Sequence, residues 1–283
     1  MNAYFRLMRL DKPVGIYLLL WPTLWALFLA AGGWPSIKLT AIFISGVVLM
    51  RSAGCVINDY ADRKIDGFIE RTQNRPIASG EVNAADALKL FFGLIVVAFI
   101  LVLFTNTLTV QLALVAAILA TLYPFTKRWT HLPQFVLGVS FAMSVPMAFA
   151  ATNGFVPGAA WWIFLATVIW TVIYDTMYAM ADREEDLKIG VKSTAVLFAQ
   201  YDRLILAGLQ IGLIVILLKI SEIFKLGIFY DFSLFLSALL MIYHQFLIKN
   251  RQKTACFRAF LHNNYIGLVI FIGIALSVTQ SAL

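Results

Sequence analysis

The chain has 283 residues, of which 61% are hydrophobic and only 13% are charged, about half the charged fraction of a typical soluble protein. Its mean hydropathy is +0.85, and no single globular core could bury so much apolar surface. The net charge of +7 is spread over short segments between apolar runs, which indicates membrane topology and no binding of nucleic acid. The composition therefore excludes a soluble enzyme, a secreted module and a disordered chain, and it indicates an integral membrane protein surrounded by a lipid bilayer.

Nine apolar segments are long enough to cross a bilayer as helices, which requires about 20 residues each. Apolar and polar residues do not alternate in these segments as they do in a transmembrane β-strand. The sequence therefore predicts an all-α, polytopic membrane fold. The nine spans are expected at about 15–33, 38–57, 87–105, 107–123, 134–152, 160–180, 204–220, 230–248 and 263–281.

The basic residues predict how these spans are oriented. Of the 22 Lys and Arg residues, all except Lys38, Lys219 and Lys225 fall on one side of the membrane if successive spans alternate in direction. Because basic residues gather on the cytoplasmic side, the N-terminus is expected in the cytoplasm. All 15 acidic residues except Glu222 and Asp231 fall on that same side. The rule that places basic residues in the cytoplasm does not explain why the acidic residues gather there too. We therefore expect a functional site at this face of the membrane.

The second span runs directly into a group of polar side chains. If the helix continues, Asn58, Asp59, Asp62 and Asp66 lie within about 100° of one another on a single helix face. The sequence thus predicts a cluster of oxygen-bearing side chains at the end of this helix.

The sixth span leads into a second acidic group. Asp182 and Asp186 are four residues apart and share a helix face, and Asp175 lies on the same face about two turns deeper in the span. A carboxylate inside a membrane span is costly, which makes Asp175 a functional candidate. The alternative is a structural carboxylate that is hydrogen-bonded to a neighbouring helix.

The two acidic groups resemble each other in sequence. Residues 61–66 and 181–186 share the pattern Ala-Asp-Arg-x-x-Asp, and each follows the second helix of a four-helix set. This similarity predicts an internal repeat, covering about 15–123 and 134–248, with a ninth helix outside it. The two acidic helix ends would then face each other across a central cavity.

Carboxylates placed this close repel one another, so we interpret the two groups as ligands of a multivalent cation rather than as solvated charges. Ligands that are all oxygen select Mg²⁺ or Mn²⁺ over zinc. Mg²⁺ often binds substrate phosphates, and a diphosphate would also attract nearby bases. The bases available on this side are Arg75, Lys127, Arg128, Arg183 and Lys192. Arg51, inside the second span, either extends to the interface or pairs with a carboxylate inside the bundle.

With Asn58-Asp59-x-x-Asp62-x-x-x-Asp66 and Asp182-x-x-x-Asp186 at the ends of paired membrane helices, the chain resembles the UbiA superfamily of intramembrane aromatic prenyltransferases. The resemblance covers nearly the whole chain, and further strings match the branch that acts in ubiquinone synthesis. These strings are residues 6–13, 54–64, 74–76, 123–128 and 188–194.

The resemblance implies one membrane domain over residues 1–283, with nine helices around a central cavity. It implies Mg²⁺-dependent transfer of a polyprenyl group from polyprenyl diphosphate to 4-hydroxybenzoate, ortho to the hydroxyl, in a bacterial inner membrane. It places the metal ligands at Asn58, Asp62, Asp66, Asp182 and Asp186. It places substrate-binding residues at Arg9, Asn58, Asp59, Arg75, Tyr123, Lys127, Arg128 and Lys192. The catalytic candidates are the four metal-binding aspartates with Asp175 and Arg128.

Other functions remain open at this point. Related aromatic or quinone precursors could serve as the acceptor. A secondary transporter also carries carboxylates among membrane helices, although its sites usually lie at the middle of the bilayer. A CDP-alcohol phosphotransferase is excluded because its Asp-x-x-Asp-Gly-x-x-Ala-Arg motif is missing here.

Overall fold

The computed structural model describes residues 2–68 and 72–280, and within these residues its regular structure is entirely helical. The α-helices are α1 (Ala3–Leu7), α2 (Val14–Ala31), α3 (Ile37–Asp62), α4 (Ala84–Val102), α5 (Thr107–Thr126), α6 (Pro133–Ala142), α7 (Ser144–Asn153), α8 (Ala160–Ile189), α9 (Thr194–Phe198), α10 (Asp202–Phe224), α11 (Ile228–Leu247) and α12 (Lys253–Gln280). Three short 3₁₀ helices complete the set: η1 (Asp66–Phe68), η2 (Ala199–Tyr201) and η3 (Ile248–Asn250).

Nine segments of the described chain are long and apolar enough to cross a membrane as helices, which confirms the predicted all-α fold. The fifth span is divided between α6 and α7 at Met143. Pro146, in the first turn of α7, cannot donate a backbone hydrogen bond to the preceding turn. The last span differs most from its predicted bounds, because α12 begins at Lys253. The first turns of α12 contact α8 through Lys253 and Phe257, and a search for apolar segments does not detect these polar turns.

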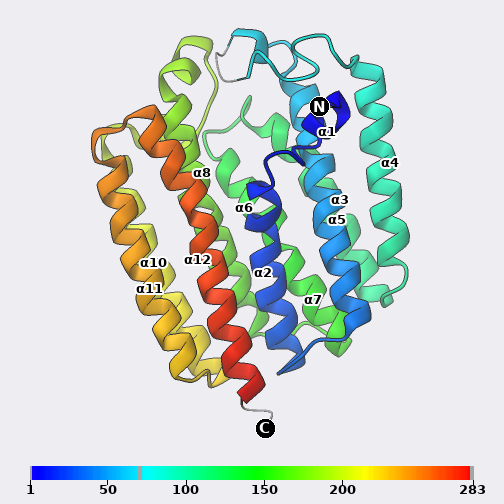
Figure 1. Ribbon diagram of the computed structural model, residues 1–283, viewed down its shortest axis with the longest axis vertical. Helices are drawn as coiled ribbons and strands as arrows, with labels where there is room; N and C mark the ends of the chain where they lie inside the picture. The colour runs from blue at the N-terminus through cyan, green and yellow to red at the C-terminus, as the bar shows by residue number, and fades with distance from the viewer. Residues whose placement is uncertain (1, 69–71, 281–283) are drawn as a thin grey trace.

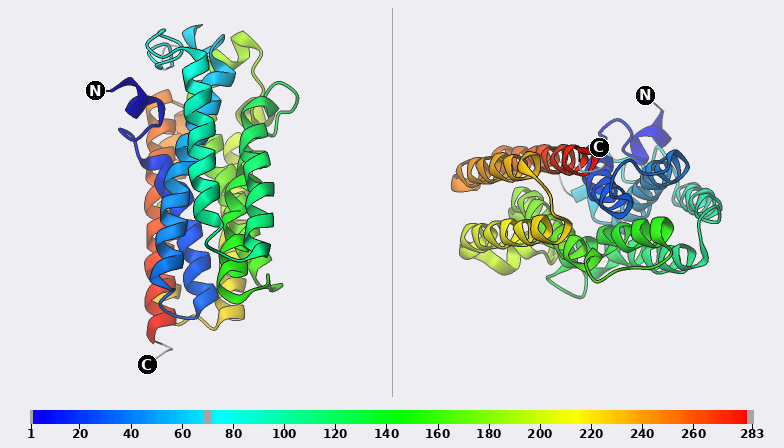
Figure 2. Two further views of the ribbon diagram at one scale, coloured as in Figure 1. Left: turned by 90° about the vertical axis from the view of Figure 1, so that its right-hand side faces the viewer. Right: turned by 90° about the horizontal axis from the view of Figure 1, so that it is seen from below.

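The long helices run side by side as one bundle (Figure 1). Seen from below, α11, α12, α2 and α3 lie along one side of the bundle, and α10, α8, α6 with α7, and α5 lie along the other (Figure 2). α4 packs mainly on α3 at one end, and α12 contacts both α2 and α8. The N-terminal segment and the C-terminus lie towards opposite ends of the bundle (Figure 1).

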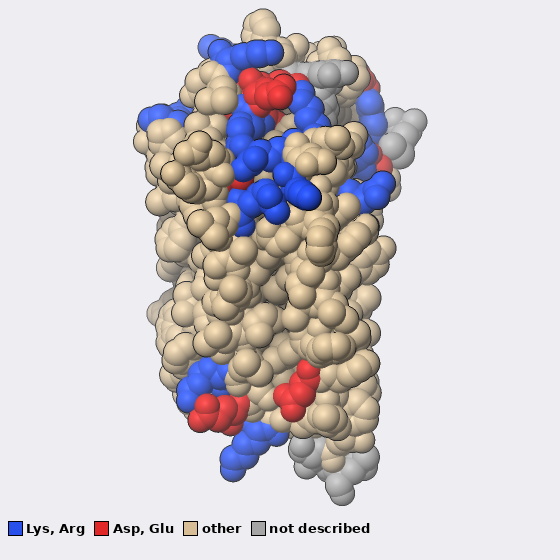
Figure 3. Space-filling model, turned by 90° about the vertical axis from the view of Figure 1, so that its left-hand side faces the viewer, with Lys and Arg blue, Asp and Glu red and all other residues tan. Residues whose placement is uncertain are grey.

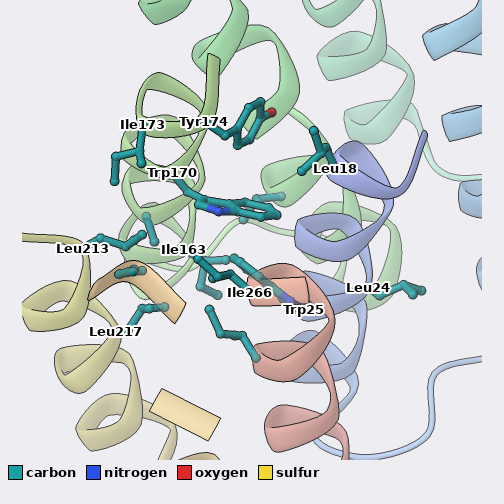
Figure 4. Packing of buried hydrophobic residues seen from close by; sticks show 14 of the residues in the cluster. Leu18, Leu24, Trp25, Ile163, Trp170, Ile173, Tyr174, Leu213, Leu217 and Ile266 are labelled. Carbon is teal, nitrogen blue, oxygen red and sulfur yellow. The ribbon is translucent and has the colours of Figure 1, made fainter. Parts of the chain in front are cut away.

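The main core lies where α2, α8 and α12 meet. The buried rings of Trp25 and Trp170 have centroids 5.3 Å apart, and both lie within the apolar cluster shown in Figure 4. The indole of Trp25 donates a hydrogen bond of 3.0 Å to the carbonyl of Gly267. A Cβ at Gly267 would collide with Trp21 and Trp170, so glycine is what allows α12 to approach this closely. This rigid contact holds α8 in place.

Charged side chains gather at the two ends of the bundle, and a broad apolar band separates them (Figure 3). One end carries α1, η1, η3 and the links that follow α5 and α8. We call it the charged end, because most basic and acidic residues lie in these segments, in the links beside them or in the adjoining helix ends. The opposite end carries a few charges, among them Lys38, Glu222 and Asp231. This distribution is the one expected if the tan band of Figure 3 lies in the hydrocarbon of a bilayer.

Candidate functional site

The first aspartate motif lies at the charged end, where α3 stops. Asp59, Asp62 and Asp66 are all nearly fully buried, with 1%, 4% and 3% of each residue exposed. The prediction of one continuous helix face was wrong in one respect, because α3 ends at Asp62 and Asp66 belongs to η1. The chain turns there through backbone bonds such as Ile65 N to Asp62 O, at 2.7 Å. Asp66 nevertheless remains beside the other two carboxylates.

Each carboxylate of this motif is paired with a base from a different segment. Arg9, which precedes α2, donates from Nη2 to both oxygens of Asp59 at 2.9 and 3.0 Å. Arg75 donates from Nη1 to Asp66 at 2.9 Å and lies 3.2 Å from Asp59. Lys127, at the end of α5, pairs with Asp62. The structure therefore brings Arg9, Arg75 and Lys127, three of the residues predicted to bind substrate, to the carboxylates of this motif.

The electrostatics of the motif favour a further cation. The pKa of Asp66 is raised to about 6, mainly by burial and also by the neighbouring carboxylates of Asp62 and Asp59, against the opposing effect of Arg75. Burial alone would lower the pKa of Arg75, but Asp59 and Asp66 outweigh it and raise that pKa. A divalent cation at the motif would offset the cost of keeping these buried carboxylates ionised.

One atom of the motif has no partner. The Oδ1 atom of Asp62 is buried and accepts no hydrogen bond, and such an orphaned carboxylate oxygen is costly unless a donor or a cation reaches it. In the described part of the chain no three His, Cys, Asp or Glu side chains converge on one point as metal ligands, and the carboxylates of the first motif face bases instead. The oxygen donors and the unpartnered Oδ1 fit a hard divalent cation.

The second aspartate motif lies on one face of the continuous helix α8. Asp175, Asp182 and Asp186 fall within about 40° of one another around its axis. Asp186 is buried, whereas Asp175 and Asp182 are partly buried. α8 ends at Gly190, whose φ of +72° suits glycine. The backbone N of Val191 donates a hydrogen bond of 3.0 Å to the carbonyl of Asp186 at this helix end.

The link after α8 lies against the link after α5. The backbone N of Lys192 donates to the carbonyl of Lys127 at 3.3 Å, and its ammonium donates to the carbonyl of Trp129 at 3.3 Å. Arg128 does not face the carboxylates, because its Nη2 donates to the carbonyl of Ala61 at 2.7 Å. Asn58 lies half-buried on α3, one turn before Asp62. The link after α5 therefore contacts both the end of α3, which carries the first motif, and the link that follows the second motif.

An apolar cavity of about 470 Å³ extends into the bundle among α2 to α7. Its described lining is apolar except for a few polar side chains, and Arg51 is the charged one among them. Tyr123 also lines the cavity and lies within electrostatic range of Arg51, Asp175 and Asp62. Tyr123 thus marks the place where the cavity approaches both aspartate motifs.

Arg51 is a site residue that the sequence did not assign. Its Nε atom is buried and has no hydrogen-bond partner, and its guanidinium lies 5.8 Å from the ring centroid of Phe141. A Cβ at Gly15 would collide with this guanidinium, so α2 makes room for it. The only signal in the sequence was an arginine inside an apolar span, and the structure places its guanidinium inside the bundle.

Comparisons with known proteins agree with this architecture. Residues 19–267 match the UbiA prenyltransferase family. A 4-hydroxybenzoate octaprenyltransferase from Vesicomyosocius okutanii subsp. Calyptogena okutanii is 68% identical over 271 residues, which cover 96% of this chain and 99% of the relative.

Two solved structures share the fold. A UbiA homolog from Aeropyrum pernix K1, in its apo form, has a TM-score of 0.81 at 23% identity, over 93% of this chain and 97% of its own. A UbiA homolog from Archaeoglobus fulgidus bound to DMAPP and Mg²⁺ has a TM-score of 0.76 at 18% identity, over 99% of both chains. With nine membrane-spanning segments in its described residues and this family match over most of its length, the chain belongs to the UbiA prenyltransferase family.

Proposed function

We propose that this chain transfers a polyprenyl group from polyprenyl diphosphate to the ring carbon of 4-hydroxybenzoate ortho to the hydroxyl, releasing diphosphate in a step of ubiquinone biosynthesis. One observation carries the proposal: a buried cluster of carboxylates and bases adjoins, through Tyr123, an apolar cavity within the membrane-spanning bundle. This arrangement suits a donor with a charged head and a long apolar tail. The choice of acceptor is supported by the 68% identical relative, which is named a 4-hydroxybenzoate octaprenyltransferase.

The apolar cavity would hold the prenyl tail near the diphosphate. Several of its lining residues are also highly exposed, including Val96, Ile100 and Leu114. These residues belong to α4 and α5, which supports a cavity that opens sideways between these two helices. A long tail can extend through this opening into lipid, which removes any need for the cavity to enclose all of it.

The carboxylates would bind Mg²⁺ and the bases would bind the diphosphate. Asn58, Asp62, Asp66, Asp182 and Asp186 are the proposed metal ligands. When bound, Mg²⁺ neutralises the charge that develops on the departing diphosphate. Asp59 would orient Arg9 and Arg75, because it already accepts hydrogen bonds or ion pairs from both.

Lys127 and Arg75 would then stabilise the leaving diphosphate as the allylic C–O bond breaks. Arg128 and Lys192 lie on the adjoining links and would add positive charge at the same side. The walls of the cavity exclude water from the allylic cation, and the ring of Tyr123 offers it an aromatic face.

The acceptor would lie between the cavity and the second motif. Arg51 has an unsatisfied Nε donor at the polar end of the cavity and would hold the carboxylate of 4-hydroxybenzoate. Asp175 lies within electrostatic range of Tyr123 and Arg51, so it is one candidate to take the ring proton. Released diphosphate is the other, and an Asp175→Asn variant with unchanged turnover would leave diphosphate as the base.

We also propose that the charged end faces the cytoplasm in a bacterial inner membrane. The support is the collection of basic residues there, since only Lys38, Lys219 and Lys225 belong to the opposite side. The whole chain would form one domain, with an internal repeat over about 15–123 and 134–248.

The direct test uses purified protein in detergent with a labelled allylic polyprenyl diphosphate and 4-hydroxybenzoate. We expect 3-polyprenyl-4-hydroxybenzoate with Mg²⁺ present, and no product with EDTA or in the Asp62→Asn and Asp182→Asn variants. Product from another phenolic acid alone would change the acceptor and keep the reaction. No product from any phenolic acceptor would overturn the proposal.

A further inference from the structure

A buried carboxylate outside the site joins α8 to the helices packed on its other side. Asp202, the first residue of α10, is completely buried. It pairs with Arg183 of α8 and accepts three hydrogen bonds from Arg251: Nε to Oδ1 at 3.2 Å, Nε to Oδ2 at 3.0 Å and Nη2 to Oδ1 at 2.8 Å. The backbone N of Arg203 donates to Oδ1 at 2.6 Å. Asp202 therefore links α8, the start of α10 and the segment between η3 and α12.

The backbone at Arg251 indicates that this cluster is tightly determined. Arg251 has a φ of +52°, a conformation that residues with a side chain rarely adopt. Besides its bonds to Asp202, it donates from Nη2 to the carbonyl of Gln200 at 2.9 Å. Such a conformation persists only where several surrounding contacts hold it in place. The contacts of Arg251 with Asp202 and Gln200 therefore fix the segment that leads into α12.

Arg183 directly follows Asp182, so the position of one constrains the other. A second ion pair, Lys253 Nζ to Glu185 Oε1 at 2.8 Å, holds the same end of α8 to the first turn of α12. At 100° per residue, with Arg183 as the reference, Glu185 lies at about 200° around α8, and Asp182 and Asp186 lie at about 260° and 300°. The aspartate face therefore lies between the two points of attachment.

The same rotation points the aspartates towards the inside of the bundle. Val168 lies five turns before Asp186 on the same line along α8. A Cβ at Gly138 of α6 would contact Val168 closely, so this line of α8 faces α6, which borders the cavity. A rotation of the end of α8 would turn Asp182 and Asp186 away from this direction.

We propose that Asp202 is a positioning residue for the second aspartate motif. Through Arg183 and Arg251 it fixes the rotation of the end of α8, and it thereby holds Asp182 and Asp186 in the direction from which they bind a divalent cation. The inference rests on the proposed function in that it takes these aspartates as metal ligands. Partners that orient metal ligands commonly contribute 10- to 100-fold to metal affinity.

The test uses the purified full-length chain and Mn²⁺, a paramagnetic cation that oxygen ligands bind as they bind Mg²⁺. Electron paramagnetic resonance measures Mn²⁺ binding without substrates, and prenyl transfer measures the Mg²⁺ dependence of the rate. We expect Asp202→Asn to weaken Mn²⁺ binding by about tenfold, at the low end of that range because Asp202 acts through Arg183. The Mg²⁺ concentration for half-maximal rate should rise by the same factor, with the KM for 4-hydroxybenzoate unchanged.

Two further variants complete the design. Asp202→Glu keeps the carboxylate and should recover most of the affinity. Asp231→Asn removes one exposed carboxylate at the opposite end of the bundle, where it contacts Ser221, and should change neither measurement. A purely structural role for Asp202 would lower the amount of folded protein without changing the Mn²⁺ affinity of what remains.

Folded Asp202→Asn that binds Mn²⁺ as tightly as the unaltered protein would overturn the proposal, whatever its total activity. If Asp202→Asn does not fold, Arg251→Gln removes the Arg251 bonds and leaves Arg183 on Asp202. It should then weaken Mn²⁺ binding by about threefold, and no change would again overturn the proposal. If the unaltered protein binds Mn²⁺ but forms no prenylated product, the proposed function fails, and the comparison of Mn²⁺ affinities still decides the role of Asp202.

Discussion

The two aspartate motifs share a sequence pattern but are held in place in different ways. The first is spread over the end of α3 and η1, and its carboxylates pair with bases from three other segments: Arg9, Arg75 and Lys127. The second lies on the uninterrupted helix α8, which is attached from outside through Asp202 and Lys253. The first motif thus combines separate segments with counter-charges from other parts of the chain, whereas the second depends on the rotation of one helix.

The largest expected effect is the same for both motifs. Asp62→Asn and Asp182→Asn should each lower kcat/KM on the order of 10³-fold, because each removes charge needed to stabilise the leaving diphosphate. Steady-state prenyl transfer at saturating Mg²⁺ measures it. Asp86→Asn, an exposed carboxylate paired with Lys89, serves as the control and should stay within about twofold. A loss in only one motif would mean that the two do not act on the same diphosphate.

Removing a base should destabilise the protein far more at the first motif than at the second. Arg75→Met leaves the buried carboxylates of Asp59 and Asp66 without their shared base, which should destabilise the protein by about 3 kcal/mol. Mg²⁺ should restore part of this loss. Lys253→Met breaks a pair whose lysine is half exposed, and it should change stability by no more than about 0.5 kcal/mol. Thermal unfolding in detergent, with and without Mg²⁺, measures both, and equal effects would contradict the comparison.

The first motif should make both the stability of the protein and its Mg²⁺ requirement depend on pH. The pKa of Asp66 lies at about 6, above its usual value of 3.8, so the fold favours the protonated carboxyl. Without metal, stability from this group should therefore fall as pH rises from about 4 to 6 and stay low above that. With metal the sign reverses, because Mg²⁺ requires the carboxylate. At pH 5 about one tenth of Asp66 is ionised, so half-activation should need about tenfold more Mg²⁺ than at pH 8. The pH dependence of stability without metal should disappear in Asp66→Asn.

The smallest effect is expected where the link after α8 contacts the link after α5. Lys192→Met removes the ammonium bond to the Trp129 carbonyl, an exposed contact that contributes little. We expect the KM for the prenyl diphosphate to rise about threefold, with stability unchanged, whereas Lys127→Met should raise it far more. Equal changes in the two variants would place Lys192 directly on the diphosphate.

Much of this architecture could be predicted because it depends on local pattern. Apolar segments of bilayer length indicate spans wherever they occur, and spacing along a helix places Asp175, Asp182 and Asp186 on one face. The break between Asp62 and Asp66 could not be predicted from spacing, because Asp66 is held in η1 by contacts with Arg75 and Thr72.

The remaining site residues depend on partners that are distant in the sequence. Arg51 lies where it does because Gly15 makes room and Phe141 lies beside it. In the sequence, Asp202 is an ordinary acidic residue at the start of a helix. The structure shows that it pairs with Arg251, which lies 49 residues later. Neither contact follows from periodicity, so only a three-dimensional structure could find them.

The proposed sideways opening of the cavity between α4 and α5 has a kinetic consequence. A donor that enters from lipid is supplied in two dimensions, so the enzyme responds to its mole fraction in the membrane rather than to its amount per volume of water. Adding empty vesicles or micelles that dilute the donor should slow the reaction at constant total substrate. The water-soluble acceptor should show no such surface dilution, and the prenylated product would return to the same lipid phase from which its tail came.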